Sequence, residues 1–171
     1  MRKVSLILLM AGLLGVSSAG LQTDIYYSVE PIAGNQWIYR YIVSNQSLIG
    51  GIEEFTIWFD QGKYTSIQKA SDPALNASWD QIVWQPNESL KSNGGFDALA
   101  LTVPIGIGES ISGFAVSFVW EGSSIPGSQY YEIVNPDNPS HILDSGFTSP
   151  EPVSLVLLLS GSVYMMFKNR K

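Results

Sequence analysis

The sequence predicts an all-β body, a single antiparallel β-sandwich of about seven or eight strands, flanked by an N-terminal signal-peptide helix and a short C-terminal hydrophobic helix. Three observations lead to this prediction. Large apolar residues recur at every second position in several short runs, aromatic and β-branched residues fill those runs, and clusters of turn-forming residues separate them. No stretch of ten or more residues in the body has the 3.6-residue period of an amphipathic helix. A closed barrel is the alternative all-β architecture.

The alternation is clearest over residues 37–43, 55–59, 99–103 and 114–120. Runs of this kind are typical of strands that bury one face in a core. Turn residues divide the runs, and Asp60-Gln61-Gly62 has the composition of a hairpin connection. The expected strands, in chain order, are 24–31, 36–44, 52–60, 63–69, 79–84, 96–103, 110–121 and 129–134.

The N-terminus has the pattern of a secretory signal peptide. Two basic residues precede an uncharged, largely apolar run over 4–16, and small residues follow it. Ser17 and Ala19 occupy the positions that a signal peptidase reads, so we expect cleavage before Gly20. As a helix the run would extend only about 20 Å, which is short for a membrane core. Residues 1–19 therefore predict export through the Sec translocon.

The C-terminus combines three features in order. Pro150-Glu151-Pro152 comes first, an uncharged apolar run over 153–167 follows, and a basic tail ends the sequence. The two prolines disfavour a regular helix and hold the chain extended before the run. As a helix the run would span about 22 Å, which makes a short membrane segment with its basic tail in the cytoplasm. The basic residues of the tail are Lys168, Arg170 and Lys171.

This arrangement resembles the PEP-CTERM sorting signal of Gram-negative bacteria, over residues 150–171. The resemblance implies that the chain is a substrate of an exosortase, a membrane enzyme that acts near the motif. It also implies delivery to the cell surface or to the exopolysaccharide matrix of a biofilm, with only transient anchoring in the inner membrane. The body resembles the uncharacterised bodies of some of these proteins, which brings no assigned activity. The segments that carry this second resemblance are 37–41, 52–60, 96–100 and 113–118.

Four parts are therefore expected: a signal peptide at 1–19, a β-sandwich at 20–134, an extended linker at 135–149 and a sorting signal at 150–171. We expect the linker to contain at most an edge strand near 141–143. Between residues 20 and 149 lie 14 of the 15 acidic residues but only four of the nine basic residues. This excess of negative charge argues against a nucleic acid as partner.

The body carries no motif for a catalytic, cofactor or metal site. The chain has no Cys and a single His, which excludes Cys-based zinc sites and Cys nucleophiles. Glu53 and Glu54 are adjacent, so on a strand they point to opposite faces and cannot flank one glycosidic bond. Asp60, Asp80 and Asp97 lie near strand ends but lack the spacing of a calcium loop.

The five Trp residues leave room for a sugar-binding surface, because aromatic rings stack on sugar rings. Trp37 and Trp120 are expected in the core, and Trp58 either faces outward or is covered on its side of the sheet. The first interpretation is a non-enzymatic structural or adhesive protein of the cell surface. The alternative is a carbohydrate-binding module for matrix exopolysaccharide, with Trp58, Trp79 and Trp84 as stacking residues; an enzyme would instead need a pocket with converging polar groups.

Overall fold

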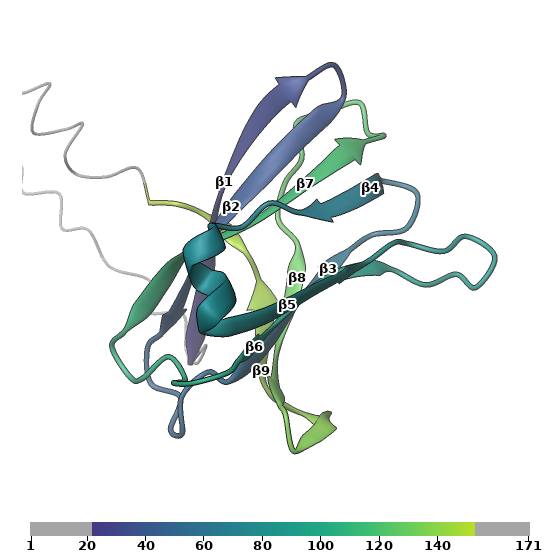
Figure 1. Ribbon diagram of the computed structural model, residues 1–171. Helices are drawn as coiled ribbons and strands as arrows, with labels where there is room; N and C mark the ends of the chain where they lie inside the picture. Colours follow the sequence, from purple (N-terminus) through teal and green to yellow (C-terminus); the bar gives the residue numbers. More distant parts are fainter. Residues whose placement is uncertain (1–21, 153–171) are drawn as a thin grey trace, which may run out of the picture.

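The computed structural model describes residues 22–152, which form a sandwich of two five-stranded sheets (Figure 1). One sheet has the order β10-β1-β2-β7-β4 and the other has the order β5-β6-β3-β8-β9. The all-β sandwich expected from the sequence is confirmed. The elements are β1 (Thr23–Ala33), β2 (Gln36–Asn45), β3 (Glu54–Phe59), β4 (Tyr64–Lys69), a 3-10 helix η1 (Pro73–Ala77), β5 (Trp79–Trp84), β6 (Gly94–Ala100), β7 (Ser110–Trp120), β8 (Tyr130–Asn135), β9 (Asn138–Phe147) and β10 (Ser149–Pro150).

The predictions for the two ends of the chain lie outside the described residues. These are the cleavage site at Ser17, Ala19 and Gly20, the apolar helix over 153–167 and the basic tail. Within residues 22–152, no helix has the length and apolar character that a membrane crossing requires.

Aromatic rings from both sheets fill the space between them. Tyr39 stacks on Phe118 with ring centroids 4.9 Å apart. Phe55 meets Phe114 edge to face, with centroids 5.0 Å apart. All four side chains are buried, as the period-two pattern predicted. Aromatic pairs of this geometry contribute about 0.5–1.5 kcal/mol each beyond the burial of their surface, so they stabilise a fold that has no disulfide.

Hydrogen-bonded tyrosines lie at one end of this core. Tyr39 donates its hydroxyl to the carbonyl of Gly127 at 2.7 Å. Tyr41 donates to the side-chain oxygen of Gln129 at 3.2 Å, and Gln129 donates in turn to the hydroxyl of Tyr64 at 3.3 Å. Burial raises the pKa of Tyr39, Tyr41 and Tyr64, because an ionised phenolate would lose its hydration.

The prediction of an extended linker over 135–149 is wrong. Residues 138–147 form β9, an edge strand that pairs antiparallel with β8 through a tight turn. The prolines in this stretch suggested a linker, but Pro136 lies in the turn and Pro139 lies at an edge, where no ladder needs its missing N–H. The short edge strand expected near 141–143 is the middle of β9. The sandwich therefore continues as far as Pro150, in β10.

A carboxylate on β9 joins the two sheets at the start of β1. Asp144 accepts hydrogen bonds from the backbone N–H of Gln22 at 2.8 Å and of Thr23 at 2.9 Å, and from the Thr23 hydroxyl at 2.8 Å. Tyr131 donates its hydroxyl to the Thr23 carbonyl at 2.7 Å, and burial raises the pKa of Tyr131 to about 12. The first residue of β1 is therefore tied to β8 and β9 of the opposite sheet.

The buried tyrosines predict a loss of stability in alkali. In the unfolded chain tyrosine ionises near pH 10, whereas the folded chain keeps these protons at higher pH. Above about pH 10 the folded state then binds more protons than the unfolded state, so the free energy of unfolding falls as the pH rises. Each group that stays protonated contributes up to about 1.4 kcal/mol per pH unit. Urea unfolding between pH 8 and about pH 11.5 measures the slope, which Tyr41→Phe should reduce. A free energy of unfolding that stays constant across this range would contradict the prediction.

The Asp144 contacts predict a second effect on stability. Asp144→Ala removes the acceptor of three hydrogen bonds, two of them from backbone groups, and should cost about 1–3 kcal/mol in urea unfolding. Asp144→Asn keeps an acceptor oxygen and should cost less. Asp137→Ala, in the exposed turn between β8 and β9, is the matched control and should stay within about 0.5 kcal/mol of the parent protein. Equal losses for Asp144→Ala and Asp137→Ala would exclude this role for Asp144.

Candidate functional site

An aromatic row crosses the outer face of the β5-β6-β3-β8-β9 sheet. Each strand contributes the outward-facing position at one level of the ladder. Tyr130 continues the β3–β8 ladder one position beyond its last paired residues. Because neighbouring strands lie about 4.8 Å apart, the row is about 19 Å long. The aromatic row consists of Trp84 on β5, Gly95 on β6, Trp58 on β3, Tyr130 on β8 and Phe147 on β9.

Gly95 allows two tryptophans from non-adjacent strands to meet. Trp84 pairs with Gly95, and Gly95 pairs with Trp58 on its other side. A Cβ atom at Gly95 would overlap the Trp84 ring, so the indole lies directly on the Gly95 backbone. Trp58 stands beside it, with ring centroids 5.5 Å apart and an interplanar angle of 77°. Both rings are half-buried and therefore present part of their surface to solvent.

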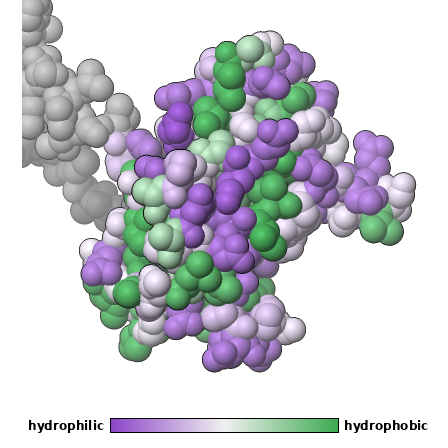
Figure 2. All heavy atoms as spheres, viewed as in Figure 1, coloured by the Kyte–Doolittle hydropathy of each residue, from purple (hydrophilic) through white to green (hydrophobic). Residues whose placement is uncertain are grey.

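The other end of the aromatic row is more exposed. Tyr130 and Phe147 form an edge-to-face pair with centroids 5.6 Å apart. Their exposed fractions are 36% and 68%, so a phenyl ring lies largely in solvent on a strand of the sheet. Elsewhere on the surface in Figure 2, hydrophobic residues form separate groups divided by hydrophilic ones. Aromatic side chains from opposite edges of the sheet thus lie in one line across it.

A second row, polar except for Ile82, runs beside the aromatic row, two residues away from it on each strand. It consists of Ile82, Asp97, Thr56, Glu132 and Ser145, and we call it the carboxylate row after Asp97 and Glu132. Glu132 accepts a hydrogen bond from the Trp58 indole N–H at 3.0 Å. Asp97 accepts one from the Thr56 hydroxyl at 2.7 Å. Each carboxylate is therefore held in place by one neighbour.

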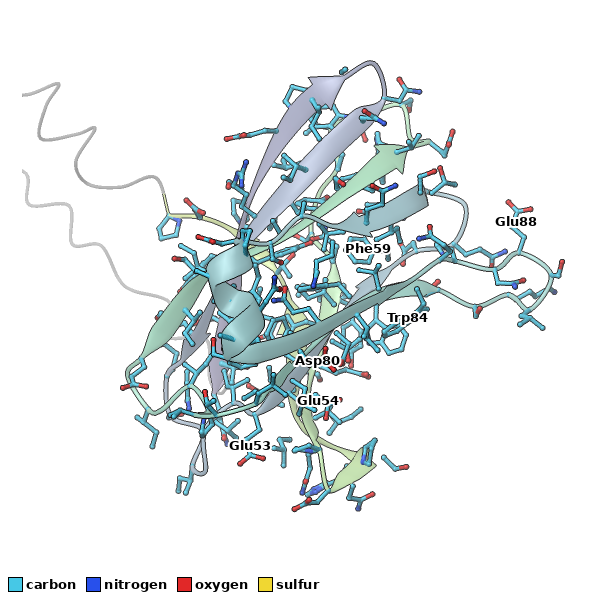
Figure 3. All side chains as sticks on the ribbon, in the orientation of Figure 1. Glu53, Glu54, Phe59, Asp80, Trp84 and Glu88 are labelled. Atoms are coloured by element: carbon cyan, nitrogen blue, oxygen red, sulfur yellow. The ribbon has the colours of Figure 1, made fainter. Side chains whose placement is uncertain are left out.

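Two further carboxylates, Asp80 and Glu54, add negative charge near Asp97. Burial raises the pKa of Asp97, and the charge of Asp80 adds to the effect. Burial also raises the pKa of Glu54, and here the charge of Asp97 adds to it. Figure 3 shows Asp80, Glu54 and Trp84 on the side of the sheet that faces away from the core, whereas Phe59 points between the sheets. The ion pairs found within residues 22–152, Arg40–Glu30 and Lys63–Asp60, involve none of the carboxylates on this face.

The structure brings together two of the three predicted stacking residues. Trp58 and Trp84 form the pair described above. The prediction that Trp79 is a stacking residue is wrong, because only 2% of its surface is exposed and it packs on Phe55 and Phe114 in the core. Its parity differs from that of Trp84 on the same strand, so only one of the two reaches the outer face.

Sequence reasoning missed the other half of the aromatic row. Tyr130 precedes the inward-facing Tyr131, and period-two alternation alone could have placed it outside. Phe147 was assigned to a linker, so it had no partner strand. Trp120 is buried and Trp37 packs against the core, as expected.

The first residue of the predicted sorting motif, Pro150, lies in an added edge strand. Strand β10 pairs parallel with β1, where Ser149 lies opposite Tyr26. The N–H of Glu151 then donates to the carbonyl of Tyr27 at 2.9 Å. Pro150, Glu151 and Pro152 are exposed. The extended conformation expected for this tripeptide is therefore present, on the sheet opposite the aromatic row.

The remaining surface offers less organised chemistry. Among residues 22–152 no three His, Cys, Asp or Glu side chains are grouped closely enough to hold a metal ion. Asp60, Asp80 and Asp97 accordingly do not converge. A hollow of about 440 Å³ lies between β4 and the loop after β5, lined by Tyr64, Gln85 and Glu88 among others.

Comparisons with known proteins give a limited result. No protein-family model matches the chain, and no curated protein sequence matches it. Among solved structures, the fold is similar to a family 3b carbohydrate-binding module from the biomass sensoring system of Clostridium clariflavum. The similarity has a TM-score of 0.43 at 11% sequence identity and covers 78% of this chain and 99% of that chain.

Proposed function

We propose that this protein is an exported, non-enzymatic surface protein that binds polysaccharide through the aromatic row. The observation that carries the proposal is the line of aromatic side chains across one open sheet face, in which Gly95 lets Trp84 lie on the backbone beside Trp58. An exposed row about 19 Å long suits a polymer that lies across the strands. A small molecule would instead be enclosed in a pocket.

The chemistry of the face matches the chemistry of a sugar ring. A pyranose has an apolar face of C–H groups and a rim of hydroxyls. The tryptophan rings offer apolar surface to the first, and burial of that surface favours contact. The carboxylate row offers fixed hydrogen-bond acceptors to the hydroxyls, because Glu132 and Asp97 each use only one oxygen on their protein partner.

The export signals fit a role at the cell surface. The signal-peptide pattern supports passage through the Sec translocon, and the tripartite C-terminus supports recognition by an exosortase with transient anchoring in the membrane. The tripeptide Pro150-Glu151-Pro152 leaves from β10, at the edge of one sheet, while the aromatic row lies on the outer face of the other. A body attached through its C-terminal end would therefore keep its binding face free for matrix exopolysaccharide.

Substitution of the tryptophans tests the binding proposal. Trp84→Ala and Trp58→Ala should each weaken binding to the best-bound insoluble polysaccharide, in a series that includes cellulose and chitin, by about tenfold or more, equivalent to about 1.4 kcal/mol. The measurement is depletion of the protein from solution, with circular dichroism to check the fold. Tyr26→Ala, on the outer face of the opposite sheet, is the matched aromatic control and should bind as the parent protein does. Unchanged binding by both Trp variants would exclude the aromatic row as the binding surface.

The intact mass of the protein from cells and medium of its host tests the export proposal. We expect a product that lacks residues 1–19 and ends near Pro150, Glu151 or Pro152, which are exposed to a processing enzyme. A product that begins at Gly20 but retains Lys171 would identify a tail-anchored membrane protein and would contradict sorting.

A further inference from the structure

We propose that the aromatic row prefers polysaccharides with protonated amino groups, such as chains of glucosamine, and that Asp97 and Glu132 are the residues that confer this preference. The inference rests on the polysaccharide binding proposed above and assigns its ligand class. It depends on the position of the carboxylate row relative to the aromatic row, on the orientation of its oxygens and on the absence of balancing positive charge.

The two carboxylates lie where the rim of a stacked sugar would be. Thr56 pairs with Asp97 on one side and with Glu132 on the other. The carboxylates are therefore separated by two strand spacings, about 10 Å, and lie about 7 Å along the strands from the aromatic row. Trp58 follows Thr56 by two residues on the same face of β3. A sugar that stacks on Trp58 or Trp84 thus turns one edge toward this pair.

Each carboxylate is oriented by a contact that leaves acceptor capacity for a ligand. One Glu132 oxygen accepts from Trp58, which is itself a stacking residue. One Asp97 oxygen accepts from Thr56, a buried residue that lies between the two carboxylates in the same row. An ionised carboxylate has about four acceptor sites, so each can also receive the N–H groups of an ammonium. Such charge-assisted hydrogen bonds are roughly twice as strong as neutral ones.

The outer face of this sheet carries acidic side chains without basic ones among the described residues. Asp80 and Glu54 both pair with Leu99, which is two residues from Asp97 on β6, so they lie near Asp97 on the same face. The basic residues of the described part of the chain lie elsewhere: Arg40 is on β2, Lys63 precedes β4, Lys69 ends β4, and Lys91 is in the exposed loop between β5 and β6. An anionic polymer would meet only repulsion here. A cation close to one of these carboxylates would instead be attracted to it.

Two oligosaccharides that differ in one group test the preference. Chains of β-1,4-linked glucosamine and their N-acetylated counterparts share a backbone, but only the first carries ammonium groups. We expect the parent protein, at about pH 6, which is above the ordinary pKa range of a carboxyl group, to bind the glucosamine chain about tenfold more tightly by calorimetry. The difference should shrink as salt is added, because salt screens exposed charges. An equal affinity for both chains would overturn the inference.

Charge-only variants locate the preference. The double variant Asp97→Asn with Glu132→Gln keeps an acceptor oxygen for Thr56 and for Trp58 but removes both charges. It should bind the glucosamine chain as weakly as the acetylated one and bind the acetylated chain as the parent does. The control is Glu30→Gln with Glu121→Gln, which removes the same charge away from this face and should leave the preference intact.

The outcomes separate the two proposals. If Trp84→Ala abolishes binding of both chains while the Asp97 and Glu132 double variant keeps the full preference, the aromatic row binds sugar but these carboxylates do not select it. If the control double variant loses the preference equally, the attraction is one of overall charge and the inference is wrong. If Trp84→Ala binds both chains as the parent does, the proposed function itself fails.

Discussion

The packing of aromatic rings between the two sheets is the interaction on which the rest of the molecule depends. Strand β3 lies in the middle of its sheet, and Phe55, Ile57 and Phe59 are fully buried. Because side chains alternate across a strand, this inward set determines that Thr56 and Trp58 face outward. A slip of one residue would move Trp58 into the core and Ile57 to the surface. The aromatic row is therefore a consequence of the core, and it persists only while the register holds.

The two faces of this sheet carry different chemistry. The inner face is apolar and aromatic; on it the Tyr131 hydroxyl donates to the Thr23 carbonyl, whereas the buried side-chain amide of Gln81 has no hydrogen-bond partner within residues 22–152. The outer face combines partly exposed rings with carboxylates that make no ion pair with any basic residue between 22 and 152. Exposed aromatic surface and unbalanced charge both cost stability. Because the aromatic row and the carboxylate row lie side by side, we interpret this face as a candidate binding surface. Pro150 lies at the edge of the other sheet, in β10, so the proposed attachment and the proposed binding surface would use separate parts of the body.

Local pattern was enough to predict most strands, because alternation and turn residues are local properties. It failed where the decisive contact is distant in sequence. Strand β9 depends on its pairing with β8, and its prolines are harmless only at an edge. On β5 the pattern misleads, because Gln81 is buried while Ile82 is 54% exposed. Trp79 was therefore assigned to the wrong face, and the partnership of Trp58 with Trp84 across Gly95 required the register of three strands.

If the aromatic row is the surface that binds polysaccharide, as we propose, a soluble ligand should perturb its tryptophans. The most direct test is a nuclear magnetic resonance titration of the protein, labelled with ¹⁵N in its tryptophan indoles, with soluble glucosamine oligosaccharide. We expect the indole N–H signals of Trp58 and Trp84 to shift with a common binding curve, while the signals of the buried Trp79 and Trp120 do not shift. Saturable binding that leaves the indole N–H signals of Trp58 and Trp84 unshifted would contradict this binding surface.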